Sequence, residues 1–202
     1  MPLWLASDPL VLASRSAARR NLLAAAGIAV EVKPADIDER AIEAGASAAE
    51  PSAAAVLLAR AKARAMAGQL PVRLVLGADQ TLALGRQRFA KPADSNAAAA
   101  QLRALRGKTH ALHSALAVVR DGTTLFEHND SAQLTMRAFS DQFLDGYLDA
   151  AGNAVTASVG AYQLEGPGIQ LFERIEGDYF TILGLPLLPL LNFLRHERYL
   201  AD

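Results

Sequence analysis

The sequence contains no cysteine among its 202 residues. Disulfides, thiolate nucleophiles and zinc–thiolate centres are therefore excluded, and the absence agrees with a reducing cytoplasm, where we expect the protein to act. No apolar run approaches the roughly 20 residues of a membrane-spanning helix. The apolar residues near the start lack the basic segment of a secretory signal. We therefore expect no membrane partner.

The chain also lacks a dominant charge of either sign, because its formal net charge is −1 at pH 7. Such a chain has no long-range field that attracts nucleic acid, so we expect no nucleic-acid partner and look for phosphate binding only in local clusters. Repeats, low-complexity segments and linkers are absent as well. With 51% hydrophobic and 20% charged residues, the composition is that of an ordinary globular chain, and the length allows one large domain or two small lobes. Because no separable linker is found, we expect residues 1–202 to form a single domain.

A short apolar run, Leu74–Leu76, is followed by Gly77 and by the carboxylate of Asp79. The run predicts a buried strand that ends at Gly77, with Asp79 at the carboxyl edge, where open α/β sheets bind ligands. A hairpin predicted over residues 81–90 returns Lys91 toward Asp79. An acid and a base on adjoining strand ends suit chemistry on a metal-bound phosphate. Taken alone, the more common role of such an Asp is to cap the next element or to pair with a surface lysine.

Polar and cationic side chains gather where a first strand, residues 10–13, passes into a helix predicted over residues 17–26. These side chains are Ser14, Arg15, Ser16, Arg19 and Arg20. Hydroxyl groups, the free amides of a helix start and three arginines form a cradle for an anion. Ser16 also suits the N-cap of the helix. The alternative is a solvated arginine face behind a serine cap, but the strand–turn–helix context favours phosphate binding, and we assign Ser14, Ser16, Arg19 and Arg20 to it.

Three carboxylates, Asp36, Asp38 and Glu39, follow the second predicted strand. Oxygen ligands of this kind collect a hard divalent cation. Asp36 and Asp38 equally suit an acidic cap for the coming helix, so Glu39 is the residue that we assign to the site. A long amphipathic helix is predicted from Ser52, and its Lys62 can face the site, although a helical lysine more commonly lies on the surface.

The rest of the chain predicts further helices and strands. Helices are expected over residues 94–105, 140–151 and 187–194, and strands over 109–119, 124–137, 169–175 and 179–183. His110 and His113 are three residues apart on a strand, so their rings face opposite sides and we expect no metal site there. The glycine-dense segment 159–168 lets the backbone close on a flat ligand. Within it, Tyr162 either stacks on that ligand or belongs to the core.

Taken in order, these segments resemble the Maf family of nucleotide pyrophosphatases. The matching residues are Leu12-Ala13-Ser14-Arg15-Ser16 with Arg19 and Arg20, Asp38-Glu39, Leu58-Ala59 with Lys62-Ala63, Gly77-Ala78-Asp79, Lys91-Pro92, Gly160-Ala161-Tyr162 with Glu165-Gly166, and Gly184-Leu185-Pro186. They occur in the order of the family and cover nearly the whole chain, from Leu10 to Leu194. Their number and spacing make the resemblance specific.

The resemblance implies a fold and a reaction. The implied fold is α/β, with a mixed twisted sheet, flanking helices and two lobes around a central cleft, as in Maf and inosine triphosphate pyrophosphatase proteins. The implied reaction is attack of water on a nucleoside triphosphate, which releases the monophosphate and pyrophosphate with Mg²⁺ or Mn²⁺. Family members are often dimers, so we expect a homodimer. A nucleotide-binding regulator of cell division with incidental hydrolysis, and a plain phosphate-binding domain, stay open as alternatives.

The resemblance also implies residue roles at the matching positions. Asp79 falls at the proton acceptor of the family, and Ser14, Arg19, Glu39, Lys62 and Lys91 fall at its substrate- and metal-site positions. A triphosphate brings roughly four negative charges, so several cations and a metal are needed around it. Glu39 and Asp79 would hold the metal, whereas Arg19, Lys62 and Lys91 would hold phosphate oxygens.

Three positions bear on the nucleobase. In the branch of the family thought to act on dTTP and UTP, Thr follows the catalytic Asp and Gln stands in the later glycine-rich loop. Here these positions hold Gln80 and Glu165, which resembles the branch thought to hydrolyse 7-methyl-GTP. A carboxylate can accept hydrogen bonds from guanine and favours the cationic ring of 7-methylguanine. Ala18 departs from the pattern, because an aromatic residue or Arg often stands there, so a dTTP or UTP preference stays the alternative.

Overall fold

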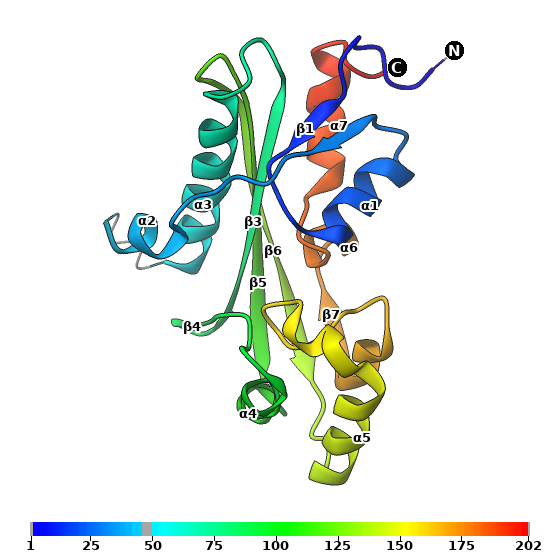
Figure 1. The fold of residues 1–202 in the computed structure, drawn as a ribbon. Coiled ribbons are helices and arrows are strands. Elements are labelled where there is room, and N and C mark those ends of the chain that lie inside the picture. Colours follow the sequence, from blue (N-terminus) through cyan, green and yellow to red (C-terminus); the bar gives the residue numbers. More distant parts are fainter. Residues whose placement is uncertain (1, 46–49, 202) are drawn as a thin grey trace.

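The computed structural model describes residues 2–45 and 50–201 and shows a mixed α/β fold (Figure 1). Its strands are β1 (Leu10–Leu12), β2 (Val30–Val32), β3 (Val75–Leu84), β4 (Gln87–Phe89), β5 (Thr109–Arg120), β6 (Thr123–Met136) and β7 (Phe172–Glu176). Its α-helices are α1 (Ala17–Ala25), α2 (Glu39–Gly45), α3 (Pro51–Ala67), α4 (Ser95–Leu105), α5 (Asp141–Ala151), α6 (Tyr179–Ile182) and α7 (Leu187–His196), and its 3₁₀ helices are η1 (Gly152–Thr156) and η2 (Pro167–Leu171).

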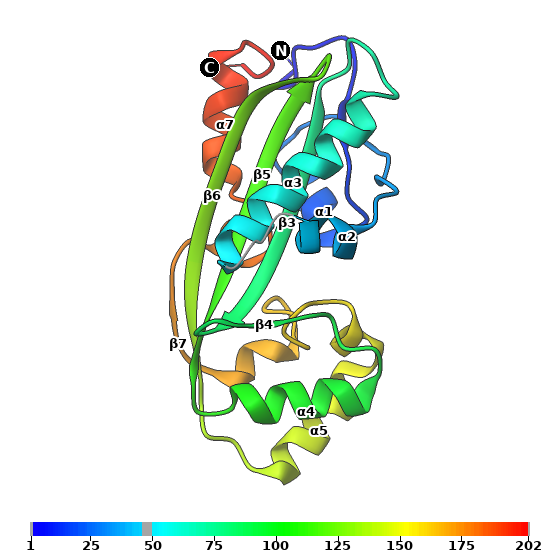
Figure 2. The same cartoon turned by 90° about the vertical axis from the view of Figure 1, so that its left-hand side faces the viewer.

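The seven described strands form one mixed sheet. Six of them follow the order β2-β1-β3-β5-β6-β7, and β4 pairs with β3 as the second strand of a hairpin. The pairs β1–β2 and β1–β3 are parallel, whereas the pairs that involve β4 to β7 are antiparallel. The view in Figure 2 shows that β3, β5 and β6 run most of the length of the molecule. The predicted mixed sheet with flanking helices is therefore confirmed.

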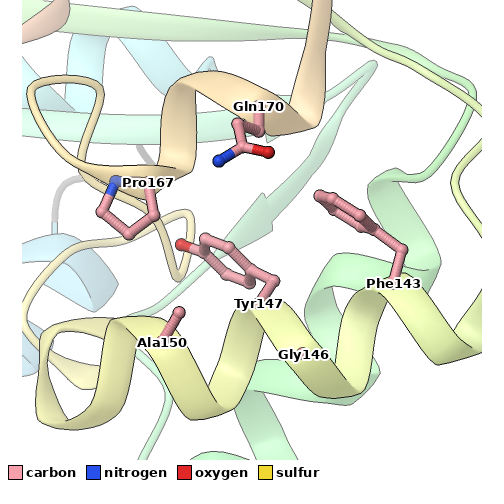
Figure 3. A pocket seen from close by; sticks show the side chains of 6 residues that line it. All are labelled: Phe143, Gly146, Tyr147, Ala150, Pro167 and Gln170. Carbon is pink, nitrogen blue, oxygen red and sulfur yellow. The ribbon is translucent and has the colours of Figure 1, made fainter.

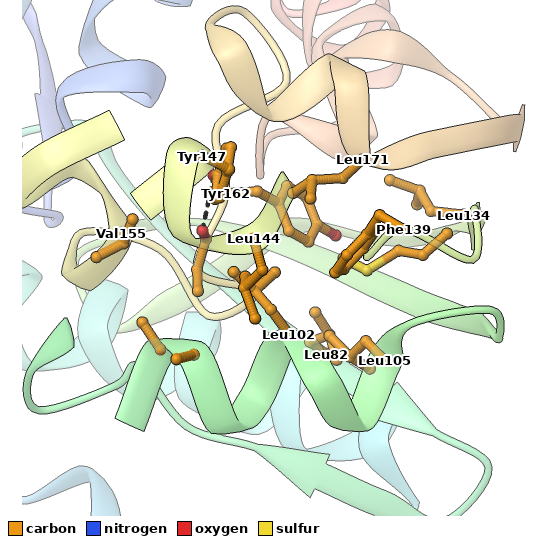
Figure 4. Packing of buried hydrophobic residues seen from close by; sticks show 14 of the residues in the cluster. Leu82, Leu102, Leu105, Leu134, Phe139, Leu144, Tyr147, Val155, Tyr162 and Leu171 are labelled. Carbon is orange, nitrogen blue, oxygen red and sulfur yellow. Dashed lines mark hydrogen bonds between the residues drawn. The ribbon is translucent and has the colours of Figure 1, made fainter. Parts of the chain in front are cut away.

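Two large hydrophobic cores share these long strands, and two smaller clusters lie under α3. The upper core joins Leu12 and Leu76 of the sheet to Leu23 of α1 and Leu190 of α7, while α3 packs on the opposite face of the same sheet region. The lower core joins Leu82, at the other end of β3, to helices α4 and α5 (Figure 4). Ala78 still belongs to the upper core and Leu82 to the lower one, so residues 79–81 of β3, which begin with Asp79, lie between the two.

Local side-chain bonds explain where several helices begin. Ser16 accepts a hydrogen bond from the amide of Arg19 at the start of α1, as predicted, and Asp94 and Ser140 cap α4 and α5 in the same way. A side-chain oxygen at this position satisfies one of the amides that a helix start leaves free. Asp38 likewise accepts from the amide of Ala41 in α2, so its role is the capping alternative.

The prediction that Gly77 ends a strand is wrong. Strand β3 continues through Gly77 as far as Leu84, so Asp79 lies within the strand and not at its end. The reason for the glycine is steric, because a Cβ atom there would overlap the backbone of Ala59 and Ala63 in α3. Gly77 therefore allows α3 to approach β3 closely.

Two predictions near the C-terminus are also corrected. Residues 179–183 were expected as a strand but begin with the helix α6, because Asp178 caps it by accepting from the amide of Thr181. Residues 169–175 were expected as one strand, yet the 3₁₀ helix η2, with Pro167 at its start, occupies the first three of them. Both segments are rich in β-branched and aromatic residues, which misled the assignment. In the part of the chain that the structure describes, none of the helices has the length and hydropathy to cross a membrane.

Candidate active site

The guanidinium group of Arg19 is buried at the start of α1. Its Nη1 donates to Ser14 Oγ at 3.0 Å and to the carbonyl of Ala78 at 2.9 Å, and its Nε donates to the carbonyl of Gly184 at 2.7 Å. Three segments distant in sequence thereby converge on one cation. The remaining nitrogen, Nη2, makes no hydrogen bond with any described residue and is not fully buried, so it is available to a ligand oxygen.

Lys62 of α3 bridges two carboxylates beside this guanidinium. Its Nζ lies 2.6 Å from Oδ1 of Asp79 and 2.8 Å from Oε1 of Glu39. The side chains of Lys62 and Asp79 are each 12% exposed, whereas that of Glu39 is 51% exposed. The predicted orientation of Lys62 toward the site is therefore what the structure shows. Oδ2 of Asp79 has no hydrogen-bond partner among the described residues, which leaves it able to accept a proton.

The electrostatic coupling of these groups appears in their pKa values. Burial raises the pKa of Asp79, while the charges of Lys62 and Arg19 act in the opposite direction and Glu39 adds to the increase. Lys91, in the segment after β4, has a lowered pKa because of partial burial and of repulsion by Arg19 and Lys62. Burial also lowers the pKa of Arg19. We call the five bonded residues the Asp79 cluster: Ser14, Arg19, Glu39, Lys62 and Asp79. Lys91 is exposed and makes no hydrogen bond or ion pair with them in the described part of the chain, so its role in the site stays a prediction.

Several residues assigned to the site lie apart from these bonds. Ser16 is occupied as the cap of α1, and Arg20 is exposed and donates to the neighbouring Asn21. Ala18 is half-buried in the same helix, and Glu165 is exposed in the glycine-dense segment. The roles of these residues in binding phosphate or base stay predictions.

Gln80, the residue after Asp79, points to the opposite face of β3. Its Nε2 lies 2.9 Å from Ser114 Oγ, 3.1 Å from the carbonyl of Thr181 and 2.9 Å from that of Ile182. Sequence reasoning missed Ser114 and the α6 carbonyls as partners of this region. A signal was present, because Ser114 is a polar residue directly before the apolar run Ala115–Val119 of β5.

Tyr162 belongs to the lower core and does not offer its ring as a stacking surface. It is 6% exposed, and its hydroxyl lies 2.8 Å from Nε2 of His110. Figure 4 shows its ring within the packed lower core. His113 lies on the other face of β5, half-buried. In residues 2–45 and 50–201 no group of three His, Cys, Asp or Glu side chains has the spacing of a metal site.

Two recesses lie away from the Asp79 cluster. One, of about 180 Å³, lies between α5 and η2 and is lined by Phe143, Tyr147 and Pro167 among others (Figure 3). The other, of about 320 Å³, lies at the start of α3 and is lined by Glu50, His113 and further residues of β3, β5 and β6. Neither lining contains a residue of the Asp79 cluster.

The cluster offers a divalent cation two carboxylates and no more. Glu39 and Asp79 each use one oxygen to bond the ammonium group of Lys62, so the second oxygen of each carboxylate is the one left for a cation. Magnesium typically takes one or two protein carboxylates and completes its shell with phosphate oxygens and water. The residues present therefore fit such an ion when a polyphosphate is bound.

The chain is similar to known proteins over its whole length. A family model described as "Maf-like protein" matches residues 9–197. A "Nucleoside triphosphate pyrophosphatase" of Rhodopseudomonas palustris is 55% identical over 201 residues, which cover 100% of both chains. A "7-methyl-GTP pyrophosphatase" of Rhizobium etli is 53% identical over 188 residues, which cover 92% of this chain and 94% of that protein.

A solved structure of a HAM1 protein from Coxiella burnetii is also similar. The match covers 64% of this chain and 73% of that chain, with 16% sequence identity and a TM-score of 0.46.

Proposed function

The chain belongs to the family of Maf-like proteins, and we propose that it is a nucleoside triphosphate pyrophosphatase. The observation that carries the proposal is the buried carboxylate of Asp79, held by Lys62 beside the guanidinium of Arg19. A carboxylate with a raised pKa and a free oxygen suits proton abstraction, and the cations around it suit a polyphosphate. The relatives with this printed activity align with the whole chain.

The cations and Ser14 would bind the triphosphate. Arg19 Nη2 and Lys91 supply donors with positive charge, and Arg19 is fixed by three hydrogen bonds before any ligand arrives. Ser14 Oγ accepts from Arg19 Nη1 and from the amide of Ser16, so its own proton remains for a phosphate oxygen. A site that is organised in advance loses little free energy to reorganisation when charge develops.

Asp79 would act as the general base. Its Oδ2 would take a proton from water as the water oxygen attacks the α-phosphorus, and the bond from that phosphorus to the oxygen bridging to the β-phosphate would break, releasing pyrophosphate. Lys62 and Arg19 favour the ionised, competent form of Asp79. Glu39 and Asp79 would hold a divalent cation, Mg²⁺ or Mn²⁺, which when bound supplies neutralisation of phosphate charge.

The preferred substrate in this proposal is 7-methyl-GTP. Two features support it: the carboxylate of Glu165, which is exposed and thus accessible to a base, and the relative from Rhizobium etli with that printed name. A carboxylate accepts hydrogen bonds from the N1–H and amino group of guanine and attracts the positive ring of its 7-methyl form. It repels the carbonyl-rich edge of uracil.

A substrate panel tests the proposal. Pyrophosphate release is measured with 7-methyl-GTP, GTP, dTTP and UTP, each with Mg²⁺, with Mn²⁺ and with excess chelator. We expect release with the divalent ion only, and the highest kcat/KM with 7-methyl-GTP. Release from none of the four would contradict the enzyme assignment, whereas a preference for dTTP or UTP would contradict only the specificity. Glu165→Gln is the matched variant, and it should lower the preference for 7-methyl-GTP over GTP.

A further inference from the structure

The amide nitrogen of Gln80 is bonded to the protein itself. Two of the three atoms that face its amide nitrogen are backbone carbonyls, those of Thr181 and Ile182. Since a carbonyl only accepts hydrogen bonds, the nitrogen and not the oxygen of the amide must face them. The donors of Gln80 are thus used to tie β3 to the end of α6, and they are not free to read a nucleobase.

Ser114 completes this attachment from the neighbouring strand. It is 0% exposed, and its Oγ accepts from Gln80 Nε2 and donates to the carbonyl of Thr181 at 2.7 Å. The same carbonyl accepts from the backbone amide of Gly184 at 3.0 Å. Three donors therefore converge on the oxygen of Thr181, and one of them belongs to the residue that holds Arg19.

Gly184 connects the attachment to the Asp79 cluster. Its carbonyl accepts from Nε of Arg19 at 2.7 Å. A Cβ atom at this position would lie 3.3 Å from Nη2 of Arg19 and 3.6 Å from Oε1 of Gln80, so the glycine backbone lies between the two side chains. Its φ of +91° is one that glycine adopts at little cost.

We propose that Gln80 and Ser114 are positioning residues, which fix the turn after α6 so that the carbonyl of Gly184 orients the guanidinium of Arg19 toward the phosphates. The inference rests on the proposed function, because nucleotide hydrolysis is one of the two quantities that test it. The positioning concerns the polyphosphate part of the substrate and is independent of the nucleobase attached to it. Gln80 thereby influences catalysis through bonds of its amide nitrogen to the protein and not through a contact of that nitrogen with the nucleobase.

The arrangement predicts a loss that is the same for every base. When either side chain loses its hydrogen bonds, the carbonyls of Thr181 and Ile182 lose donors and the turn shifts. Arg19 then keeps its positive charge, but its guanidinium group is no longer held in the orientation that faces the phosphates. Small displacements of groups that bind the reacting phosphates lower rates by roughly 10- to 100-fold.

The test compares Ser114→Ala, Gln80→Met and the control Thr81→Val. Thr81 lies beside Gln80, is buried, and donates to the carbonyl of Pro51 at the start of α3 and not to α6. Two quantities are measured: the affinity for inorganic tripolyphosphate, which has no base, and kcat/KM for 7-methyl-GTP, GTP and dTTP. We expect Ser114→Ala and Gln80→Met to weaken both by about 10-fold, by the same factor for each nucleotide, while Thr81→Val stays within about 2-fold.

A second background separates positioning from a loss of stability. An Arg19→Lys chain has no guanidinium group for Gly184 to orient. Adding Ser114→Ala to it should therefore lower the affinity for tripolyphosphate by less than about 2-fold. Thermal unfolding checks that each variant is folded. If Ser114→Ala is not folded, the same measurements on Gln80→Met test the proposal.

Three results would overturn the proposal. One is a change in the preference among the three nucleotides in Gln80→Met but not in Ser114→Ala, which would show that Gln80 contacts the nucleobase. Another is a double variant Arg19→Lys/Ser114→Ala whose affinity for tripolyphosphate is reduced by the full product of the two single-variant factors. The third is an affinity for tripolyphosphate that neither variant changes. If the wild-type chain binds tripolyphosphate through this arrangement but releases no pyrophosphate from any nucleotide, the proposed enzyme function fails and the positioning role stands.

Discussion

At the scale of single residues, two opposing influences set the protonation of Asp79. Removal from water raises its pKa, because the charged form loses hydration, and the ammonium of Lys62 lowers it again. The balance matters because only the ionised form can accept a proton from water. Lys62 is thus both a candidate phosphate ligand and the group that keeps the base available.

Replacing Lys62 by methionine should move the acid side of the pH–rate profile to higher pH. Without the cation, burial acts on Asp79 with less opposition, its pKa increases, and the base is protonated at pH values where the wild type is active. The measurement is kcat/KM against pH. Lys108→Met is the control, since Lys108 is exposed and donates to the carbonyl of Ala104 at the end of α4, away from Asp79. An acid limb that does not move would contradict the coupling.

His110 should make the fold less stable in mild acid. Burial lowers its pKa from 6.5 to about 4, and its Nδ1 is buried without a hydrogen-bond partner among the described residues. The unfolded chain therefore takes up this proton first as the pH falls. The free energy of unfolding should decrease between pH about 6.5 and about 4, by up to about 3 kcal/mol from this group, and not further below that range.

Denaturant unfolding of a His110→Gln variant checks this. A glutamine can still bond to the hydroxyl of Tyr162 but does not titrate, so the variant should lose less stability than the wild type between pH 6.5 and 4. His196→Gln, at an exposed position, should keep the wild-type slope. Equal slopes for His110→Gln and the wild type would show that His110 is not the titrating group.

At the scale of elements, the approach of α3 to β3 brings Lys62 to Asp79. The two residues lie on different elements, and Gly77 makes the close packing of these elements possible because a Cβ there would overlap the backbone of α3. The position of the cluster thus depends on a residue that carries no functional group.

Gly77→Ala should therefore damage both stability and activity. The extra carbon forces α3 away from β3, which we expect to cost about 2 kcal/mol or more of unfolding free energy and to reduce kcat/KM with it. Gly146→Ala on α5 is the matched control, because nothing lies within 4 Å of a Cβ at that position and alanine favours helix by up to about 1 kcal/mol. If Gly77→Ala is as stable as the wild type, the steric account is wrong.

Most elements were predictable from local patterns, and the exceptions have physical reasons. Capping residues such as Ser16 and Asp94 mark helix starts in the sequence itself. The extent of β3 was not predictable, because the glycine that suggests a strand end serves a contact with a helix distant in sequence. Helix α6 was missed because a four-residue helix has too little periodicity to compete with its β-forming residues.

The same distinction holds for the candidate site. The motifs and the family resemblance assigned every side chain of the Asp79 cluster to the site, including its cations. The backbone carbonyls of Ala78 and Gly184, which hold Arg19, could not be predicted, because every residue has such a group and only tertiary structure selects one. Ser114 was missed for another reason: its hydroxyl is visible in the sequence, but its partners Gln80 and Thr181 are distant along the chain.

At the scale of the whole molecule, the cluster lies where two hydrophobic cores meet on shared strands. Its bonds join residues from Ser14 to Gly184, so nearly the whole chain must fold before Arg19, Lys62 and Asp79 are in place. The lower core adds the segment that carries Glu165. In this account the sheet positions the general base Asp79, and the helices α1 and α3 supply Arg19 and Lys62.

The measurement that tests this account most directly is single-site replacement of that base. With Asp79→Asn, kcat for triphosphate hydrolysis should fall by roughly 100-fold or more while the affinity for the nucleotide changes only a few-fold. Asp149→Asn, at an exposed position of α5, should behave as the wild type. An Asp79→Asn protein that is folded and hydrolyses the triphosphate at near the wild-type rate would contradict the assignment of Asp79 as the catalytic base.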